Sequence, residues 1–159
     1  MKKRIYIYSL ILFIIDLIIK LIIKNNMNLY NSITLIPNFF NLTYVINDGA
    51  AFSILKGKQI FLIILAIIVF ISILYYLHKD KLNKIKTIYY SLLIGGILGN
   101  LLDRIIYNGV IDYLDFKIFT YDAPIFNLAD TFIFFGVVLI LFEGIKGDKN
   151  GNRSIGKWY

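Results

Sequence analysis

The second apolar stretch of this chain decides its fold, and it reads IFLIILAIIVFISILYYL over residues 60–77. No charged side chain interrupts it, and it does not alternate apolar with polar residues as a membrane-spanning strand does. A helix rises about 1.5 Å per residue and a hydrocarbon core is about 30 Å thick, so about 20 such residues cross it. The stretch is therefore predicted to be a transmembrane helix.

Three further apolar runs of similar length lie at about residues 5–23, 87–107 and 125–145. The chain of 159 residues is 58% hydrophobic and only 17% charged, with a mean hydropathy of +0.72. Typical soluble domains are about 45–50% apolar and about 25% charged. The sequence therefore predicts an all-α integral membrane protein, a single membrane domain with four transmembrane helices. Little chain remains for a separate soluble module.

Basic residues gather on one side of the predicted helices. They precede the first helix at residues 2–4, join the second to the third at residues 79–86, and follow the fourth at residues 146–157. Cytoplasmic segments of membrane proteins carry an excess of Lys and Arg. We therefore expect both termini to be cytoplasmic, with a disordered cytoplasmic tail at residues 147–159.

Two loops are then expected on the outer side, at about residues 24–59 and 108–124. The longer loop contains a short strand candidate, Leu-Thr-Tyr-Val at residues 42–45, followed by an Asn-Asp-Gly turn at residues 47–49. We expect this loop to form a small sheet on the membrane surface.

Charge and composition exclude several classes of protein. The formal net charge of +7 does not predict nucleic-acid binding, because the basic residues flank apolar runs rather than forming one face of a folded domain. The chain has no cysteine, which excludes disulfides, thiolate catalysis and thiolate metal sites. Its one histidine, His78, lies in a Lys-rich turn and is expected to be solvated. No metal site and no cofactor is predicted.

Polar residues of three predicted helices fall at one depth, in the outer half of the membrane. An ionisable residue at membrane depth is costly, and it marks a functional site by default. Residues three or four apart share a helix face, so each helix can direct its polar pair inward. The set consists of Asp16 and Lys20 on the first helix, Asn100, Asp103 and Arg104 on the third, and Asn127 and Asp130 on the fourth.

Several of these residues also allow a structural interpretation instead of a role in a functional site. Asp16 and Lys20 are either a neutralising pair within one helix or part of a site. Asp103 and Arg104 are expected to form an ion pair that closes the outer end of the bundle. The glycines within residues 95–99 are expected to let a neighbouring helix approach closely.

Two aspartates carry a sharper hypothesis: Asp112 in Gly-Val-Ile-Asp-Tyr and Asp130 in Pro-Ile-Phe-Asn-Leu-Ala-Asp. If their carboxyl groups meet in a low-dielectric site, like-charge repulsion prevents both from ionising, and they share one proton. One carboxylate then takes a proton from water while the acid partner polarises a carbonyl, as in aspartic peptide hydrolysis. Spacing alone does not decide whether they converge. Asp115 and Asp122, in the same outer loop as Asp112, are expected to be solvated carboxylates.

Five sequence blocks, in order along about residues 10 to 145, resemble those of the lipoprotein signal peptidases, also called signal peptidase II. Any one block alone would be a weak signal, whereas five in the family's order are highly specific. The blocks are Asp-Leu-Ile-Ile-Lys at 16–20, Asn-Asp-Gly-Ala-Ala-Phe-Ser at 47–53, Gly-Asn-Leu-Leu-Asp-Arg at 99–104, Gly-Val-Ile-Asp-Tyr at 109–113, and Pro-Ile-Phe-Asn-Leu-Ala-Asp at 124–130.

This resemblance implies a four-helix membrane aspartyl peptidase with a small extracytoplasmic β-cradle. It implies that Asp112 and Asp130 are the catalytic pair and that the Asp16 and Lys20 pair supports them. The residues that it implies line the site, holding substrate or neighbouring groups, are Asn47, Gly49, Asn100, Arg104 and Asn127. Tyr113 stands where the family commonly has Phe, and its added hydroxyl is expected to reach the interface.

The resemblance also implies the substrate and the place of action. The substrate would be a bacterial prolipoprotein that already carries diacylglycerol on its lipobox cysteine, and cleavage would fall just before that cysteine. The enzyme would act in the bacterial cytoplasmic membrane, with its active site near the outer leaflet. We expect a monomer.

Two functions of other classes compete with the peptidase. A proton-coupled transporter or channel predicts ionisable residues through both leaflets, whereas the inner half of every predicted helix is nearly free of charge. A non-enzymatic lipoprotein-binding or assembly factor remains open. Presenilin-like and prepilin-type membrane proteases carry a Gly-x-Gly-Asp block that this chain lacks.

Overall fold

The structure of the protein is a computed structural model that describes residues 1–50, 54–118 and 121–149. In the described residues, four long helices and the strands of a small sheet follow one another in the order α1, β1, β2, α2, α3, β3, β4, α4. The helices are α1 (Lys2–Asn26), α2 (Gln59–Lys79), α3 (Lys84–Tyr107) and α4 (Leu128–Lys149), and the strands are β1 (Ser32–Ile36), β2 (Phe40–Asn47), β3 (Val110–Ile118) and β4 (Tyr121–Asp122).

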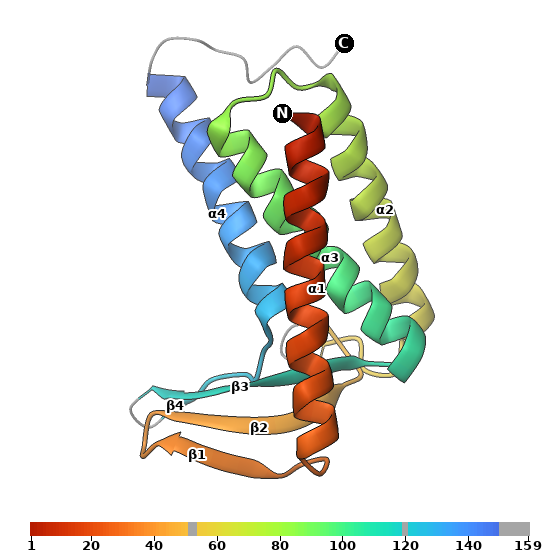
Figure 1. Ribbon diagram of the computed structural model, residues 1–159, viewed down its shortest axis with the longest axis vertical. Helices are drawn as coiled ribbons and strands as arrows, with labels where there is room; N and C mark the ends of the chain where they lie inside the picture. Colours follow the sequence, from red (N-terminus) through yellow and green to blue (C-terminus); the bar gives the residue numbers. More distant parts are fainter. Residues whose placement is uncertain (51–53, 119–120, 150–159) are drawn as a thin grey trace.

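Helix α3 is the centre of the bundle, and α1, α2 and α4 all contact it (Figure 1). In its most apolar window α3 is 61% buried, whereas the corresponding windows of α1, α2 and α4 are only 22%, 11% and 11% buried. The outer three helices therefore expose long apolar surfaces, as lipid-facing helices do. All four are long and apolar enough to cross a membrane, which confirms the predicted number of transmembrane helices.

Glycines on α3 allow its two main neighbours to approach closely. A Cβ atom on Gly96 would lie 2.5 Å from the backbone oxygen of Ala129 on α4. A Cβ atom on Gly99 would collide with the carboxylate of Asp16 on α1. The predicted close approach is thus present on both sides of α3, and it brings α1 and the start of α4 against the polar part of α3.

The sheet lies at one end of the bundle, opposite the N-terminus, with its strands running across the helix direction (Figure 1). Its strands pair antiparallel in the order β1-β2-β3-β4. Between β2 and β3 an irregularity separates Leu42 from Val45, and Val45 lies opposite Asp112. The predicted strand at residues 42–45 is confirmed as the middle of β2.

A buried apolar cluster joins this sheet to the bundle. Ile23 of α1 packs with Tyr44 of β2 and with Ile111 and Tyr113 of β3, and none of the four is more than 7% exposed. One face of the sheet is therefore fixed against α1 by hydrophobic contact.

Three predicted boundaries need correction. The expected outer loop at residues 108–124 contains β3, which is extended because it pairs with β2 over residues 110–116. The fourth helix begins at Leu128 rather than at about residue 125, because Phe126 first pairs with Leu114 of β3 in an isolated bridge. The tail expected to be disordered from residue 147 is helical as far as Lys149, and residues 150–159 lie outside the described part of the chain.

Because α3 and α4 pack so closely at Gly96, the addition of a single methyl group there should destabilise the protein. Gly96→Ala is expected to lower the free energy of unfolding by about 1–3 kcal/mol, because the added carbon meets a backbone oxygen that cannot move without separating the helices. Thermal unfolding in detergent measures this. The matched control is Gly144→Ala on α4, where nothing lies within 4 Å of the added carbon. Equal melting temperatures for the two variants would contradict the close packing described.

Candidate active site

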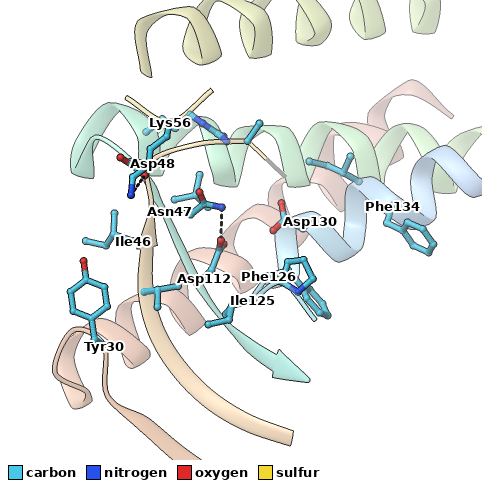
Figure 2. A pocket seen from close by; sticks show the side chains of 16 residues that line it. Tyr30, Ile46, Asn47, Asp48, Lys56, Asp112, Ile125, Phe126, Asp130 and Phe134 are labelled. Carbon is cyan, nitrogen blue, oxygen red and sulfur yellow. Dashed lines mark hydrogen bonds and ion pairs between the residues drawn. The ribbon is translucent and has the colours of Figure 1, made fainter. Parts of the chain in front are cut away.

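Asp112 and Asp130 lie together at the edge of one pocket of about 600 Å³ (Figure 2). Asp112 comes from β3 and Asp130 from the first turn of α4. Asn127 contacts both: its Nδ2 donates to Oδ1 of Asp112 at 2.7 Å, and its backbone N–H donates to Oδ2 of Asp130 at 3.2 Å. The structure therefore brings the two predicted carboxylates into one site, one from a strand and the other from a helix.

The local sequence Asn-Leu-Ala-Asp explains why Asp130 sits where it does. The backbone N–H of Asp130 donates to Oδ1 of Asn127 at 2.9 Å, while Oδ2 of Asp130 accepts from the backbone N–H of Asn127. This reciprocal pair is the geometry of a capping box, in which the first residue before a helix and the third residue within it satisfy each other's amides. Asp130 is thereby fixed to the beginning of α4.

Two other elements hold the remaining amides at this helix start. The backbone N–H of Leu128 donates to the hydroxyl of Tyr113 at 3.3 Å, and that of Ala129 donates to Oδ1 of Asp16 at 3.0 Å. The first N–H groups of a helix have no partner within the helix, so these contacts satisfy groups that would otherwise be buried unpaired. The Tyr113 side chain points inward and is 3% exposed, so the expectation that its hydroxyl reaches the interface was wrong.

Lys20 is buried at the centre of the polar set, with 1% of its side chain exposed. Its Nζ lies 2.8 Å from Oδ2 of Asp16, 2.9 Å from Oδ2 of Asp103 and 3.1 Å from Oδ1 of Asn100. The pair of Asp16 and Lys20 is therefore more than a contact within one helix. The predicted ion pair between Asp103 and Arg104 was wrong, because adjacent helical residues point about 100° apart and Asp103 faces α1.

Asn100 connects this charged centre to Asp130. Its Nδ2 donates to Oδ1 of Asp130 at 2.7 Å, and its Oδ1 accepts from Nδ2 of Asn127 at 3.1 Å in addition to the contact with Lys20. The two carboxyl groups of the site are thus linked through two amide side chains.

The far wall of the pocket comes from β2 and the turn that follows it. Nδ2 of Asn47 donates to Oδ2 of Asp112 at 3.1 Å, the contact drawn as a dashed line in Figure 2, and Oδ1 of Asn47 accepts from the backbone N–H of Gly49 at 2.9 Å. Arg104 also lines the pocket, and its guanidinium donates to the backbone oxygens of Asn100 and Gly49 at 3.4 Å. The structure therefore joins into one network the nine residues that the resemblance assigns to the site.

Burial controls the electrostatics of Asp112, whose residue is 2% exposed. Loss of solvent and, after it, the negative charge of Asp130 together raise the pKa of Asp112 to about 7, against the hydrogen bonds from Asn47 and Asn127, which lower it. A carboxyl group in this position holds a proton close to neutral pH while a second carboxyl group stands beside it. Within residues 1–50, 54–118 and 121–149, no group of three His, Cys, Asp or Glu side chains is placed to hold a metal ion.

Sequence reasoning missed part of the hydrogen bonding made by the strand that carries Asp112. Asp115, expected to be a solvated loop carboxylate, accepts hydrogen bonds from Thr43 at 2.6 Å and Asn41 at 3.2 Å across the sheet. The inward role of the Tyr113 hydroxyl was also missed. Had residues 110–118 been recognised as a strand, the alternation of side chains along it would have placed Asp112 on the face opposite Tyr113 and Asp115. Asp122 lies on β4.

The fold and the site together define a multi-pass membrane protein with a pair of carboxyl groups, one buried and one half-buried, at one end of its helix bundle. The family model for signal peptidase (SPase) II matches residues 8–146. The chain belongs to this family, the lipoprotein signal peptidases, and is therefore a peptidase of lipoprotein processing.

Individual relatives agree with this assignment. The chain is 41% identical over 152 residues to the lipoprotein signal peptidase of Staphylococcus haemolyticus, covering 92% of this chain and 96% of that protein. It is 39% identical over 148 residues to that of Halothermothrix orenii, covering 93% and 99%. A solved bacterial membrane enzyme, determined by the in meso method at 2.3 Å resolution, superposes with a TM-score of 0.87 at 38% identity, covering 96% of this chain and 94% of that one.

Tyr113→Phe tests the contact between β3 and the start of α4. Loss of the hydroxyl leaves the part-buried N–H of Leu128 without its partner, so we expect the free energy of unfolding to fall by about 1 kcal/mol. Tyr6→Phe, at a residue 43% exposed on α1, is the control and should change stability little. If thermal unfolding showed the same melting temperature for both variants, the hydroxyl would not be holding α4.

The raised pKa of Asp112 predicts a pH dependence of stability. The folded protein binds this proton more tightly than the unfolded chain, so the contribution is full below the ordinary pKa of 3.8 and is lost as the pH rises through about 7. The melting temperature of the wild type should therefore fall between about pH 4 and about pH 8 relative to that of Asp112→Asn, which cannot titrate. Parallel melting curves against pH would show that Asp112 ionises normally.

Proposed function

We propose that this chain is an aspartic endopeptidase that removes signal peptides from diacylglyceryl-modified bacterial prolipoproteins, cleaving just before the lipidated cysteine. The observation that carries the proposal is the convergence of Asp112 and Asp130 on one pocket, joined by Asn127. The names of the relatives support the lipoprotein substrate, since both are lipoprotein signal peptidases.

The proposed reaction uses water and the two carboxyl groups. One carboxylate takes a proton from water, and the oxygen of that water bonds to the scissile carbonyl carbon. The protonated partner gives its proton to the carbonyl oxygen. The tetrahedral diol then collapses and the C–N bond breaks. The leaving nitrogen takes a proton from the carboxyl pair, and one hydroxyl group of the diol gives a proton back to the pair. The raised pKa of Asp112 supports this scheme, because the pair retains one proton near neutral pH.

The lining of the pocket suits the end of an apolar signal peptide. Its walls include Ile125, Phe126, Ile133 and Phe134 around a few polar groups, and its volume of about 600 Å³ is that of an ordinary ligand site. The apolar walls bind side chains of the segment before the cysteine, and Asn47 and Arg104 hold its backbone.

The proposed orientation puts the sheet and the pocket at the outer face of the bacterial cytoplasmic membrane, with both termini in the cytoplasm. The basic residues at the opposite end of the bundle support it, because Lys and Arg accumulate on the cytoplasmic side. A diacylated cysteine is anchored in the outer leaflet, with about 0.8 kcal/mol of burial free energy per CH₂ group. Such a substrate presents its scissile bond at the depth of the pocket. We propose that the single domain acts as a monomer.

The distribution of buried charge favours the peptidase over a proton-coupled transporter. Among the described residues, the buried charged side chains are Asp16, Lys20, Asp103 and Asp112, and all of them belong to the site network at one end of the bundle. Toward the other end the buried hydroxyls of Ser9 and Ser91 bond to helix backbone. A relay across the membrane would require ionisable groups there.

Asp112→Asn and Asp130→Asn each test the mechanism in purified, folded protein. We expect each to lower the cleavage of a lipidated prolipoprotein by at least about 10²-fold, because each removes one partner of the proton transfers. A gel shift and mass spectrometry of the released peptide measure cleavage. The control is Asp115→Asn, a carboxylate of the same strand that bonds across the sheet, which should cleave near the wild-type rate.

Two results would overturn the proposal at different levels. Near-normal turnover by folded Asp112→Asn or Asp130→Asn protein would rule out the aspartic mechanism. Binding of the lipidated prolipoprotein by the wild type without any released peptide would identify a binding or assembly factor instead.

A further inference from the structure

We propose that Lys20 is a positioning residue, whose single ammonium group sets the placement of Asp112 relative to Asp130. This inference rests on the proposed aspartic mechanism and concerns how the pair is held. Lys20 does not line the pocket. It acts on the two carboxyl groups through three partners: Asp16, Asp103 and Asn100.

Two of these partners hold the backbone immediately before each reactive aspartate. Asp16, paired with Lys20 at 2.8 Å, accepts the N–H of Ala129, which directly precedes Asp130. Asp103, paired with Lys20 at 2.9 Å, accepts the N–H of Ile111, which directly precedes Asp112, at 3.1 Å. The helix start and the strand that carry the pair are therefore both tied to the same nitrogen, each one residue away from the reacting group.

The third partner sets the direction of the amides between the carboxyl groups. The side-chain amide of Asn100 has a donor end and an acceptor end that a half-turn would exchange. With Oδ1 toward Lys20 and Asn127, its Nδ2 donates to Asp130 at 2.7 Å. After a half-turn the amide oxygen of Asn100 would face the carboxyl group of Asp130, and its amide NH₂ group would face the ammonium of Lys20. The ammonium excludes that arrangement.

The orientation of Asn100 also determines the contact to Asp112. Nδ2 of Asn127 has two hydrogens, of which one is donated to Oδ1 of Asn100 and the other to Oδ1 of Asp112. This arrangement requires an acceptor on Asn100 to face Asn127. Lys20 therefore orders hydrogen bonds that end on both carboxyl groups.

The burial of Lys20 supports a positioning role over a purely stabilising one. The side chains of Lys20, Asp16 and Asp103 are at most 2% exposed. Replacing buried ion pairs with apolar side chains of similar volume is often neutral or stabilising in other proteins, so such a cluster is weak evidence for stability alone. Its contacts here converge on the backbone and amides around one site.

The test compares two double variants that bury the same net charge. Asp16→Asn with Lys20→Met has no donor at position 20, whereas Asp16→Asn with Lys20→Gln has an amide donor there. In both, Oδ1 of residue 16 can still accept from Ala129. Steady-state kinetics on a lipidated prolipoprotein, after a check of folding by circular dichroism and thermal unfolding, separates kcat from KM.

We expect the Met variant to lose kcat by about 10²-fold with little change in KM, which is the loss that a misplacement of about 1 Å causes in a reacting pair. The Gln variant should recover about tenfold of this loss. If both variants fold and their kcat values agree within about twofold, the positioning role is wrong. A wild type that releases no peptide would instead overturn the proposed function, so the two failures are distinguishable.

If the Met variant does not fold, Asn100→Leu keeps Lys20 with both of its carboxylates and removes only the amide arm. The proposal then predicts a fall in kcat of about tenfold or more with KM retained. A folded Asn100→Leu protein with wild-type kcat would overturn it.

Discussion

The buried ammonium of Lys20 is the interaction on which the rest of the site depends. A charge away from water is tolerated only when it is paired and hydrogen-bonded, and the partners of Lys20 come from both α1 and α3. Those partners meet only because the two helices approach closely, and Gly99 leaves the space that the carboxylate of Asp16 occupies. Close helix packing and charge pairing are therefore one constraint here, since a larger residue at position 99 would push away the carboxylate that neutralises Lys20.

The second constraint is the beginning of α4. A helix that starts inside a protein presents several N–H groups that must be bonded, and here the acceptors come from Asp16, Tyr113 and Asn127, while Asp130 accepts in return from Asn127. The carboxyl group of Asp130, which is proposed to be catalytic, is thus part of the N-terminal cap of a helix. Its position follows from the hydrogen-bonding needs of the backbone, and it does not depend on a flexible loop.

The sequence predicted the parts of the fold that depend on local composition. Four apolar runs gave four helices, and counting the rise along each helix placed Asp16, Lys20, Asn100 and Asp130 at one depth. The sequence did not predict which charged residues form ion pairs, because Asp103 pairs with Lys20 on another helix rather than with its neighbour Arg104. The convergence of Asp112 with Asp130 could be expected from the resemblance to a family but not from spacing, since it depends on how β3 lies against α4. Strand β3, with its carboxylates, was predicted only as part of an outer loop between two helices.

Those same carboxylates show what the strand does for the site. Along β3, successive side chains point to opposite faces. Ile111 and Tyr113 pack against α1, so one face of the strand is anchored in the apolar cluster. Asp112, between them, must then point to the other face, where the pocket lies. The hydrophobic anchor and the reactive group are therefore coupled by alternation alone. A shift of one residue in the pairing of β3 with β2 would bury a charge against α1 and turn an apolar side chain into the pocket, so the register of this small sheet is as important to the site as the aspartate itself.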